Sequence, residues 1–529
     1  MIEKESIVAA YGVFRWTNAN GNFENVGFIP SPTSTSNQIG ACIHRFCRDV
    51  AQPNPWISND FYQYCVNFID LNFQPLTPDE LASYEEWEKH VPYNQKRKEA
   101  LREYRNLQTL PPDVYDSKSF GKWEQYATWK HMRAINSPSD ISKSILGPLI
   151  YSSDKKTFKT RYFVKGSDPR TWPARLRRLF GNLPVVETDF SSFESHHQGV
   201  FSCVILYWLD RMTRHVRTEV QWQLINQLVM GHNRTIFKNI TCTIAQRLMS
   251  GVMFTSSANG VLNLMIMSYL ASQAQAPNLN PAARAQWSTA NFLGLFEGDD
   301  GIGLDYGISR QQITNLGVDL SFDRHENFAH ANFCGITCPV HDGSIITDPI
   351  AAIRKFFVIP PKYMRSRDKC VASLMRAKAL SYLTLYRDCP IVGPLAHRVC
   401  TLTRSYDARP YLAETRHYLV SVDETDGVSP PNIAMSTRQL MWDKFHISPS
   451  RQLEIERAIA EQGPWFRIDL TDLLPPEVIN FAVSHLTEDG EHPGLARYDP
   501  PAVVAANIAA PPGPLHPRNN TPFLVTPGT

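Results

Sequence analysis

The chain has 529 residues, of which 43% are hydrophobic and 20% charged, and its formal net charge at pH 7 is +2. This apolar fraction can build a sizeable core, so the composition excludes a largely disordered protein. The near-neutral balance excludes a histone-like polycation, and any binding to nucleic acid must therefore come from a local basic surface.

Cysteine usage and hydropathy favour a soluble protein in a reducing compartment. Ten cysteines are spread along the chain without a CxxC pair, which disfavours a disulfide framework. The N-terminus lacks the charged-then-apolar order of a signal peptide. The longest apolar run, at residues 204–209, is far shorter than the ~20 residues that a transmembrane helix needs.

The N-terminal third gives weak signals for secondary structure. Residues 12–16 and 26–29 favour short strands among turns, Thr77–Glu80 favours the start of a helix with proline at its first position, and residues 93–107 favour a second helix. From Asp154 to Gly181 nine lysines and arginines face only two acids. That local excess indicates either a phosphate-binding surface or a solvated face.

The centre of the chain alternates strands and helices. Its pattern predicts a strand, a helix, a hairpin, a long helix and a strand pair, at residues 184–189, 200–212, 234–247, 255–275 and around 297–301. Later helices are predicted at residues 351–357, 370–386, 451–459 and 476–486, and Pro, Ala, Gly and Asn predominate beyond Glu488. This order indicates an α+β core, a helical C-terminal lobe and a tail.

Two adjacent acids stand at the tip of the predicted strand pair. Gly298-Asp299-Asp300-Gly301 separates two apolar runs, which is typical of a β-hairpin. Neighbouring carboxylates repel each other unless cations neutralise them. A plain turn is the alternative interpretation, because Asp and Gly are common turn residues.

A further acid, Asp189, ends the strand at residues 184–189, and Glu194 follows five residues later. Ligands collect at the C-terminal ends of strands. If the two strands are neighbours, Asp189 and Asp299 can share two divalent cations ~3.5–4 Å apart. Oxygen ligands favour Mg²⁺ or Mn²⁺. Asp189 can equally be a helix N-cap, and the two roles are compatible.

A polar stripe runs along the long predicted helix. Ser250-Gly251 forms a hinge before it, and Thr255, Asn259 and Asn263 are spaced at i, i+4 and i+8 on one face. The rest of that helix is largely apolar. The stripe therefore predicts hydrogen bonds, either to neighbouring protein groups or to a ribose.

Together these three features resemble the palm motifs of viral RNA-directed RNA polymerases. They match in order and spacing, as motif A at Asp189–Glu194, motif B at Ser250–Asn259 and motif C at Gly298–Asp300. Residues 333–338 and 347–355 resemble the region after the site in nodavirus-like and tombusvirus-like enzymes of positive-strand RNA viruses. The resemblance covers roughly residues 155–360.

The resemblance implies an α+β right-hand polymerase with an antiparallel palm sheet and a helical thumb. The N-terminal region and fingers would occupy residues 1–183, and the palm residues 184–360 with a fingers insertion at about 213–245. The thumb would occupy residues 361–488, followed by a Pro/Ala-rich C-terminal tail at 489–529.

It also implies a role for individual residues. Asp189 and Asp299 would hold two Mg²⁺ ions, replaceable by Mn²⁺, with support from Asp300. The nucleotide-binding residues would be Glu194 and Asn259 at the ribose 2′-hydroxyl, Ser250, Gly251 and Thr255 in the loop beneath the template, and Lys165 and Arg175 at the triphosphate. The implied reaction is attack of an RNA 3′-hydroxyl on the α-phosphate of an NTP.

The sequence departs from the family pattern in three places. Glu194 stands where Asp is commoner, and Val252 stands where related enzymes often carry an acid. No lysine in residues 317–333 matches the expected proton donor to pyrophosphate. His325 and Arg324 are the candidate general acids there, and histidine is the better one near neutral pH.

Two alternatives to this function stay open. A reverse transcriptase would be expected to carry an aromatic residue where Gly298 stands. A catalytically inactive palm that serves as an RNA-binding scaffold is disfavoured by the intact acids Asp189, Asp299 and Asp300.

Four other side chains have the spacing of metal ligands, at His330, Cys334, Cys338 and His341. Zinc would need all four to converge, whereas buried free cysteine is common in cores. Despite the spacing, structural cysteines are therefore the favoured interpretation over a zinc site.

The expected partners are an RNA template and product and NTPs. Because the sequence predicts no membrane span, the resemblance also implies a separate membrane-anchored or other viral replication protein. That partner would recruit the chain to a membrane-associated replication complex in the host cytoplasm.

Overall fold

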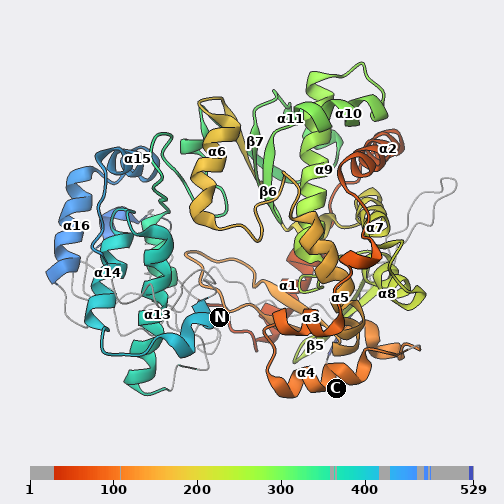
Figure 1. Ribbon diagram of the computed structural model, residues 1–529, viewed down its shortest axis with the longest axis horizontal. Helices are drawn as coiled ribbons and strands as arrows, with labels where there is room; N and C mark the ends of the chain where they lie inside the picture. The colour runs from red at the N-terminus through yellow and green to blue at the C-terminus, as the bar shows by residue number, and fades with distance from the viewer. Residues whose placement is uncertain are drawn as a thin grey trace.

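The computed structural model describes residues 29–107, 109–357, 363, 366–415, 429–461, 470–474, 477 and 524–527. The strand predicted at residues 12–16, nearly all of that at 26–29, almost all of the helix predicted at 476–486 and most of the tail lie outside the described residues. Within the described ranges, helices surround two small sheets (Figure 1). The predicted α+β class is confirmed.

The N-terminal part is helical where the sequence indicated mainly turns. It forms α1 (Thr35–Ala41), a π-helix η2 (Cys42–Phe46) and α2 (Pro55–Asn72). Asn54 caps α2 by accepting a hydrogen bond of 2.9 Å from the Ile57 main-chain N–H. The interpretation of this region as strands and turns was therefore wrong over α1 and α2.

The predicted helix start at Thr77 was wrong in extent. Its capping box opens only the 3-10 turn η3 (Pro78–Glu80), because Leu81 then adopts an extended conformation with ψ 114°. The next helix, α3 (Tyr84–His90), begins instead at a Ser83 cap. The helix predicted at residues 93–107 is confirmed as α4 (Gln95–Tyr104).

The first sheet combines strands from distant parts of the chain. It contains β1 (Asp116–Gly121), β2 (Ala134–Pro138), β4 (His232–Ile236), β5 (Ile240–Ala245) and β9 (Leu524–Pro527) in the order β2-β1-β4-β5-β9. Only the β1–β4 pair is parallel. The β4–β5 pair confirms the hairpin predicted at residues 234–247.

The second sheet is antiparallel throughout and carries the acidic motifs. It contains β3 (Val185–Phe190), β6 (Gly294–Glu297), β7 (Asp300–Leu304) and β8 (Leu320–His325) in the order β6-β7-β3-β8. Both strand regions predicted from the sequence are confirmed. β3 lies between β7 and β8, so the strand that ends near Asp189 is central.

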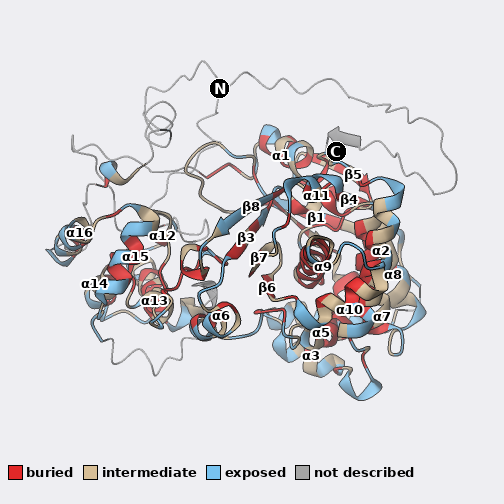
Figure 2. Cartoon of the chain, turned by 90° about the horizontal axis from the view of Figure 1, so that it is seen from above, coloured by how far each residue is buried: buried red, intermediate tan, exposed pale blue. Residues whose placement is uncertain are grey.

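Both faces of this second sheet are covered. Val186 and Phe190 join the core built with α9 (Thr255–Gln275), whereas Val185 joins a separate core with α6 (Trp172–Phe180). Neighbouring strand residues point to opposite faces, which explains this division. α9, predicted with the same bounds, is buried over most of its length, and Figure 2 shows it in the midst of the other helices.

Further helices contribute to the large core that contains α2 and α9. They are α5 (Asp140–Thr157), α7 (Val200–Thr213), α8 (Glu219–Met230), α10 (Pro281–Asn291) and α11 (Arg310–Asn315). α7 confirms the helix predicted at residues 200–212.

The C-terminal helices form a core of their own on one side of the molecule (Figure 1). They are α12 (Pro349–Phe356), α13 (Asp368–Tyr386), α14 (Val392–Leu402), α15 (Met435–Phe445) and α16 (Pro449–Glu461). The helices predicted at residues 351–357, 370–386 and 451–459 are confirmed. Among the described residues, no helix has the length and apolar character needed to cross a bilayer.

Candidate active site

A tight hairpin presents the paired acids. β6 and β7 are joined by Gly298 and Asp299, and Glu297 pairs with Asp300 across the ladder. Gly298 has φ +62° while Asp299 keeps a negative φ, which is the pattern of a type II′ turn. The buried side chains of Leu295 and Ile302 anchor the two strands. Asp299 therefore lies at the very end of a fixed hairpin.

The end of β3 lies beside this hairpin. In the antiparallel register Thr188 is opposite Gly301, so Asp189 comes next to Asp300. Burial and the charges of Asp299 and Glu187 raise the pKa of Asp189. Burial and the charges of Asp299 and Asp189 raise the pKa of Asp300 to about 7. The three acids predicted from motifs A and C are therefore brought together.

These carboxylates suit a hard divalent cation. They offer only oxygen donors, and a cation would relieve the repulsion that raises their pKa values. As the side chains stand, no three Asp, Glu, His or Cys residues in the described part of the chain are grouped closely enough to hold an ion. His330, Cys334, Cys338 and His341 do not form such a group either, so the structure gives no support to a zinc site among them.

The loop after Asp189 is held by arginines from the N-terminal segment. Glu194 accepts a hydrogen bond of 2.8 Å from Arg45 Nε. Arg48 donates to the main-chain oxygen of Ser191 at 3.2 Å and pairs with Asp319. Sequence reasoning missed both arginines, because Arg45 is separated from Glu194 by 149 positions and nothing near it in the sequence indicates a partner.

The polar stripe on α9 faces the acidic turn. Asn263 Nδ2 donates to the main-chain oxygens of Asp299 at 2.9 Å and Gly298 at 3.4 Å. The Oδ1 atom of Asn259, one helical turn earlier, is buried and has no hydrogen-bond partner among the residues that the structure describes. A Cβ atom at Gly260 would lie only 3.0 Å from the Phe163 ring, so glycine permits this close packing.

The loop before α9 is fastened to β2. Ser250 Oγ donates to the Ala134 main-chain oxygen at 2.6 Å, and the Asn136 N–H donates to the Ser250 main-chain oxygen at 2.7 Å. Gly251 has φ +103°, and a Cβ atom there would lie 2.7 Å from the Asn136 main-chain oxygen. The Thr255 hydroxyl donates within the same loop, to the Met249 main-chain oxygen at 3.0 Å.

The basic segment runs beside the edge strand β6. The Phe296 N–H donates to the Tyr162 main-chain oxygen at 2.9 Å, and the Val164 N–H donates to the Phe296 oxygen at 3.3 Å. This pairing brings Lys165 Nζ within 3.3 Å of Glu297 Oε1. The Lys165 ammonium also donates to Ser256 Oγ at 2.5 Å, so it links the hairpin to the start of α9.

A cavity of about 670 Å³ opens along this segment. Six cationic side chains line it, namely Lys155, Lys159, Arg161, Lys165, Arg175 and Arg178. Arg175 also braces the wall, since its guanidinium donates to the main-chain oxygens of Phe163 at 2.8 Å and Arg161 at 2.7 Å. The arrangement can attract a polyanion and guide it toward the hairpin.

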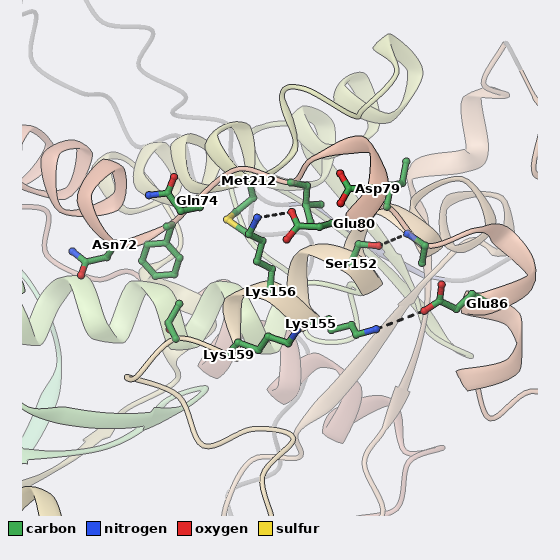
Figure 3. Close-up of a pocket in the computed structure, with 15 residues that line it drawn as sticks. Asn72, Gln74, Asp79, Glu80, Glu86, Ser152, Lys155, Lys156, Lys159 and Met212 are labelled. Atoms are coloured by element: carbon green, nitrogen blue, oxygen red, sulfur yellow. Dashed lines mark hydrogen bonds and ion pairs between the residues drawn. The ribbon is translucent and has the colours of Figure 1, made fainter.

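A second cavity, of about 460 Å³, shares Lys155 and Lys159 with the first (Figure 3). Its cations are largely neutralised. Lys156 Nζ lies 2.5 Å from Glu80 Oε2, and Lys155 Nζ lies 3.6 Å from Glu86 Oε1 (Figure 3). The excess positive charge therefore faces the first cavity.

The two candidate general acids, His325 and Arg324, lie away from the three carboxylates of the candidate site. His325 is opposite Val185, four residues from Asp189 along β3, which corresponds to about 13 Å. Its ring Nε2 lies 3.2 Å from Glu187 Oε2. Arg324 Nε donates to Asp305 Oδ2 at 2.9 Å. This placement speaks against either residue as proton donor at the site.

The motif geometry can be compared with known proteins at this point. The family model described as viral RNA-dependent RNA polymerase matches residues 152–326. That range contains all three acids, the helix α9 with its polar stripe, and the basic segment at residues 154–181. Residues 152–326 are a viral RNA-dependent RNA polymerase domain. The chain therefore contains an RNA-directed RNA polymerase domain, whose activity is RNA-dependent RNA synthesis. No curated protein matches the chain.

The fold brings one more side chain, that of Cys334, close to the acids. The sequence analysis considered this side chain only as a possible zinc ligand. Cys334 sits in a tight turn with φ +54°, followed by Gly335 with φ +77°. Burial and the charge of Asp300 raise the pKa of the Cys334 thiol, which is also hydrogen-bonded to that carboxyl. The thiol therefore stays protonated and can donate to Asp300.

Proposed function

We propose that Asp189, Asp299 and Asp300 form the catalytic centre, where nucleotides from NTPs are added to an RNA 3′-hydroxyl as a viral RNA genome is replicated. The observation that carries this proposal is the register of β3 against β7, which places Asp189 next to Asp300 at the hairpin that carries Asp299, near a cavity lined with cations. Two bound Mg²⁺ ions, or Mn²⁺ in their place, would supply Lewis-acid stabilisation of charge on the reacting phosphates. The three carboxylates would hold those ions.

The remaining motif residues bind the nucleotide in this proposal. Lys165 and Arg175 receive the triphosphate in the basic cavity, where their donors can pair with phosphate oxygens. Glu194 and Asn259 recognise the ribose 2′-hydroxyl, and the unpartnered, buried Oδ1 of Asn259 supports that role. Ser250, Gly251 and Thr255 shape the loop beneath the template. The geometry supports no role for His325 or Arg324 as general acid.

The domain assignment is part of the same proposal. A palm at residues 184–360 is supported by the antiparallel sheet β6-β7-β3-β8. Fingers at residues 1–183, with an insertion at about 213–245, are supported by the pairing of β4 with β1. A thumb at residues 361–488 is supported by the separate core of the C-terminal helices.

We place the enzyme on the nodavirus-like and tombusvirus-like side of the family, on the resemblance of residues 333–338 and 347–355. Such a polymerase works in a replication complex on host membranes in the cytoplasm. The described part of this chain offers no helix able to span a membrane. A membrane-anchored viral protein is therefore the proposed partner that recruits it.

The test is incorporation of labelled NTP by purified protein on an RNA template with Mg²⁺ or Mn²⁺. Asp299→Asn and Asp189→Asn should each lower the rate by at least about 100-fold, because each removes one carboxylate charge with little change in shape. Asp113→Asn, at an exposed acid of η4 (Pro112–Tyr115), is the matched control. Equal rates in wild type and Asp299→Asn would refute the assigned centre.

A further inference from the structure

The N-terminal segment at residues 42–48 connects the first sheet to the motif A loop. Arg247, just after β5, donates from Nε to the Phe46 main-chain oxygen at 2.8 Å, and this guanidinium is buried. The sulfur atoms of Cys47 and Cys242 lie 3.6 Å apart. These contacts fix one side of the segment to β5, while Arg45 and Arg48 reach the loop that follows Asp189.

Arg45 holds one oxygen of Glu194 and leaves the other open. The Arg45 Nε to Glu194 Oε1 distance is 2.8 Å, and the two side chains are only 22% and 21% exposed. Among the described residues, Glu194 Oε2 has no hydrogen-bond partner. A charge-assisted contact in a partly buried site restricts the rotamers of a flexible side chain. Glu194 Oε2 is thus held in one direction and remains able to accept a hydrogen bond.

We propose that Arg45 is a positioning residue that orients Glu194 and thereby sets the preference for ribonucleotides over 2′-deoxyribonucleotides. The inference rests on the proposed function, in which Glu194 recognises the ribose 2′-hydroxyl. Glutamate has one more rotatable bond than the aspartate common at this position, so it needs an added restraint to present its oxygen in one place. Arg45 supplies that restraint from a segment anchored on β5.

The experiment compares kcat/KM for a ribonucleotide and for its 2′-deoxy analogue in the full-length enzyme. Arg45→Ala should reduce the ribo/deoxy ratio by about tenfold, mainly through poorer use of the ribonucleotide. Arg45→Lys should restore part of the ratio, since an ammonium keeps the charge without the planar geometry. Arg97→Ala, which removes a 2.6 Å ion pair to Asp140 in another part of the molecule, should leave the ratio unchanged.

Both substrates are measured on one preparation, so the ratio is independent of the fraction of folded enzyme. An Arg45→Ala enzyme that loses activity equally on both substrates, or on neither, would overturn the inference. Glu194→Ala separates this failure from that of the underlying function. If Glu194→Ala lowers the ratio and Arg45→Ala does not, only the positioning role fails. If Glu194→Ala leaves the ratio unchanged, the proposed role of Glu194 fails, and the inference with it.

Discussion

The side-chain amide of Asn263 donates a hydrogen bond of 2.9 Å to the main-chain oxygen of Asp299. Through this contact the central helix α9 holds the turn that carries Asp299, the proposed catalytic acid. Gly260 lies at the same place: a Cβ atom there would be in ordinary contact with Gly298 N at 3.6 Å but would press on the Phe163 ring at 3.0 Å. This hydrogen bond thus joins α9, which carries part of motif B, and the motif C turn into one unit.

Asn263→Ala should loosen this unit. The main-chain oxygens of Gly298 and Asp299 would lose a donor, and we expect the free energy of unfolding to fall by about 1 kcal/mol and NTP incorporation to fall more than stability alone explains. Thermal unfolding and steady-state incorporation measure the two effects. Asn291→Ala is the control, since among the described residues that amide donates only to the Trp287 main-chain oxygen at the exposed end of its own helix. Full activity in Asn263→Ala would show that the turn does not need this support.

Gly251→Ala should damage the loop before α9 for two reasons. The residue has φ +103°, and the new methyl group would lie 2.7 Å from the Asn136 main-chain oxygen. We expect a loss of about 1–3 kcal/mol in stability and a rate lower by about 100-fold, as for a site displaced by 1 Å. Gly181→Ala isolates backbone strain, because Gly181 has φ +54° but open space around it. Similar effects of the two variants would mean that the clash with Asn136 is unimportant.

Substitutions at Lys165 and Arg175 should distinguish a loss of nucleotide binding from a loss of structural support. Lys165→Ala removes a half-exposed cation beside Glu297, and KM for NTP should rise by about tenfold with little change in melting temperature. Arg175→Ala should raise KM and also lower the melting temperature, because the main-chain oxygens of Phe163 and Arg161 lose their donors. Arg178→Ala, at an exposed cation of the same cavity, should leave the melting temperature unchanged.

His197 should make the fold sensitive to acid. The ring is buried, and neither nitrogen has a hydrogen-bond partner in the described part of the chain. Burial and the charges of His196 and Arg247 lower the pKa of His197 to about 3, against roughly 6.5 in an unfolded chain. Below pH 6.5 His197 binds a proton in the unfolded state but stays neutral in the folded state. The free energy of unfolding therefore falls as the pH falls toward 3.

His197→Phe should remove this contribution, because phenylalanine does not titrate and the Phe193 ring lies 5.1 Å away. Urea unfolding at pH 7 and pH 5 measures it. Wild type should lose about 2 kcal/mol more than the variant between these values. His215→Gln, at an exposed histidine, should behave like wild type. An equal acid loss in wild type and His197→Phe would contradict the assignment.

Local signals in the sequence were sufficient for much of the catalytic domain. The bounds of α9, the β6–β7 strand pair and the strand that ends near Asp189 follow from hydrophobic periodicity and from Gly-Asp turn chemistry, which act over a few residues. The same kind of signal was present in α2, whose buried Phe61, Tyr64 and Phe68 have helical spacing, yet it was missed among turn-forming neighbours. At Thr77 the capping signal was real, but Leu81 ended the turn.

By itself, then, the sequence determined which acids, amides and cations are candidates for the site and on which elements they lie, because residue type and short-range spacing are written in it directly. Only the tertiary structure decided which of them meet. Arg45 reaches Glu194, Lys165 reaches Glu297 and Asn263 reaches Asp299 through the packing of segments far apart in the chain. It equally kept His325 away from the acids, because the register of β8 against β3 is set by the whole sheet and not by any neighbouring residue.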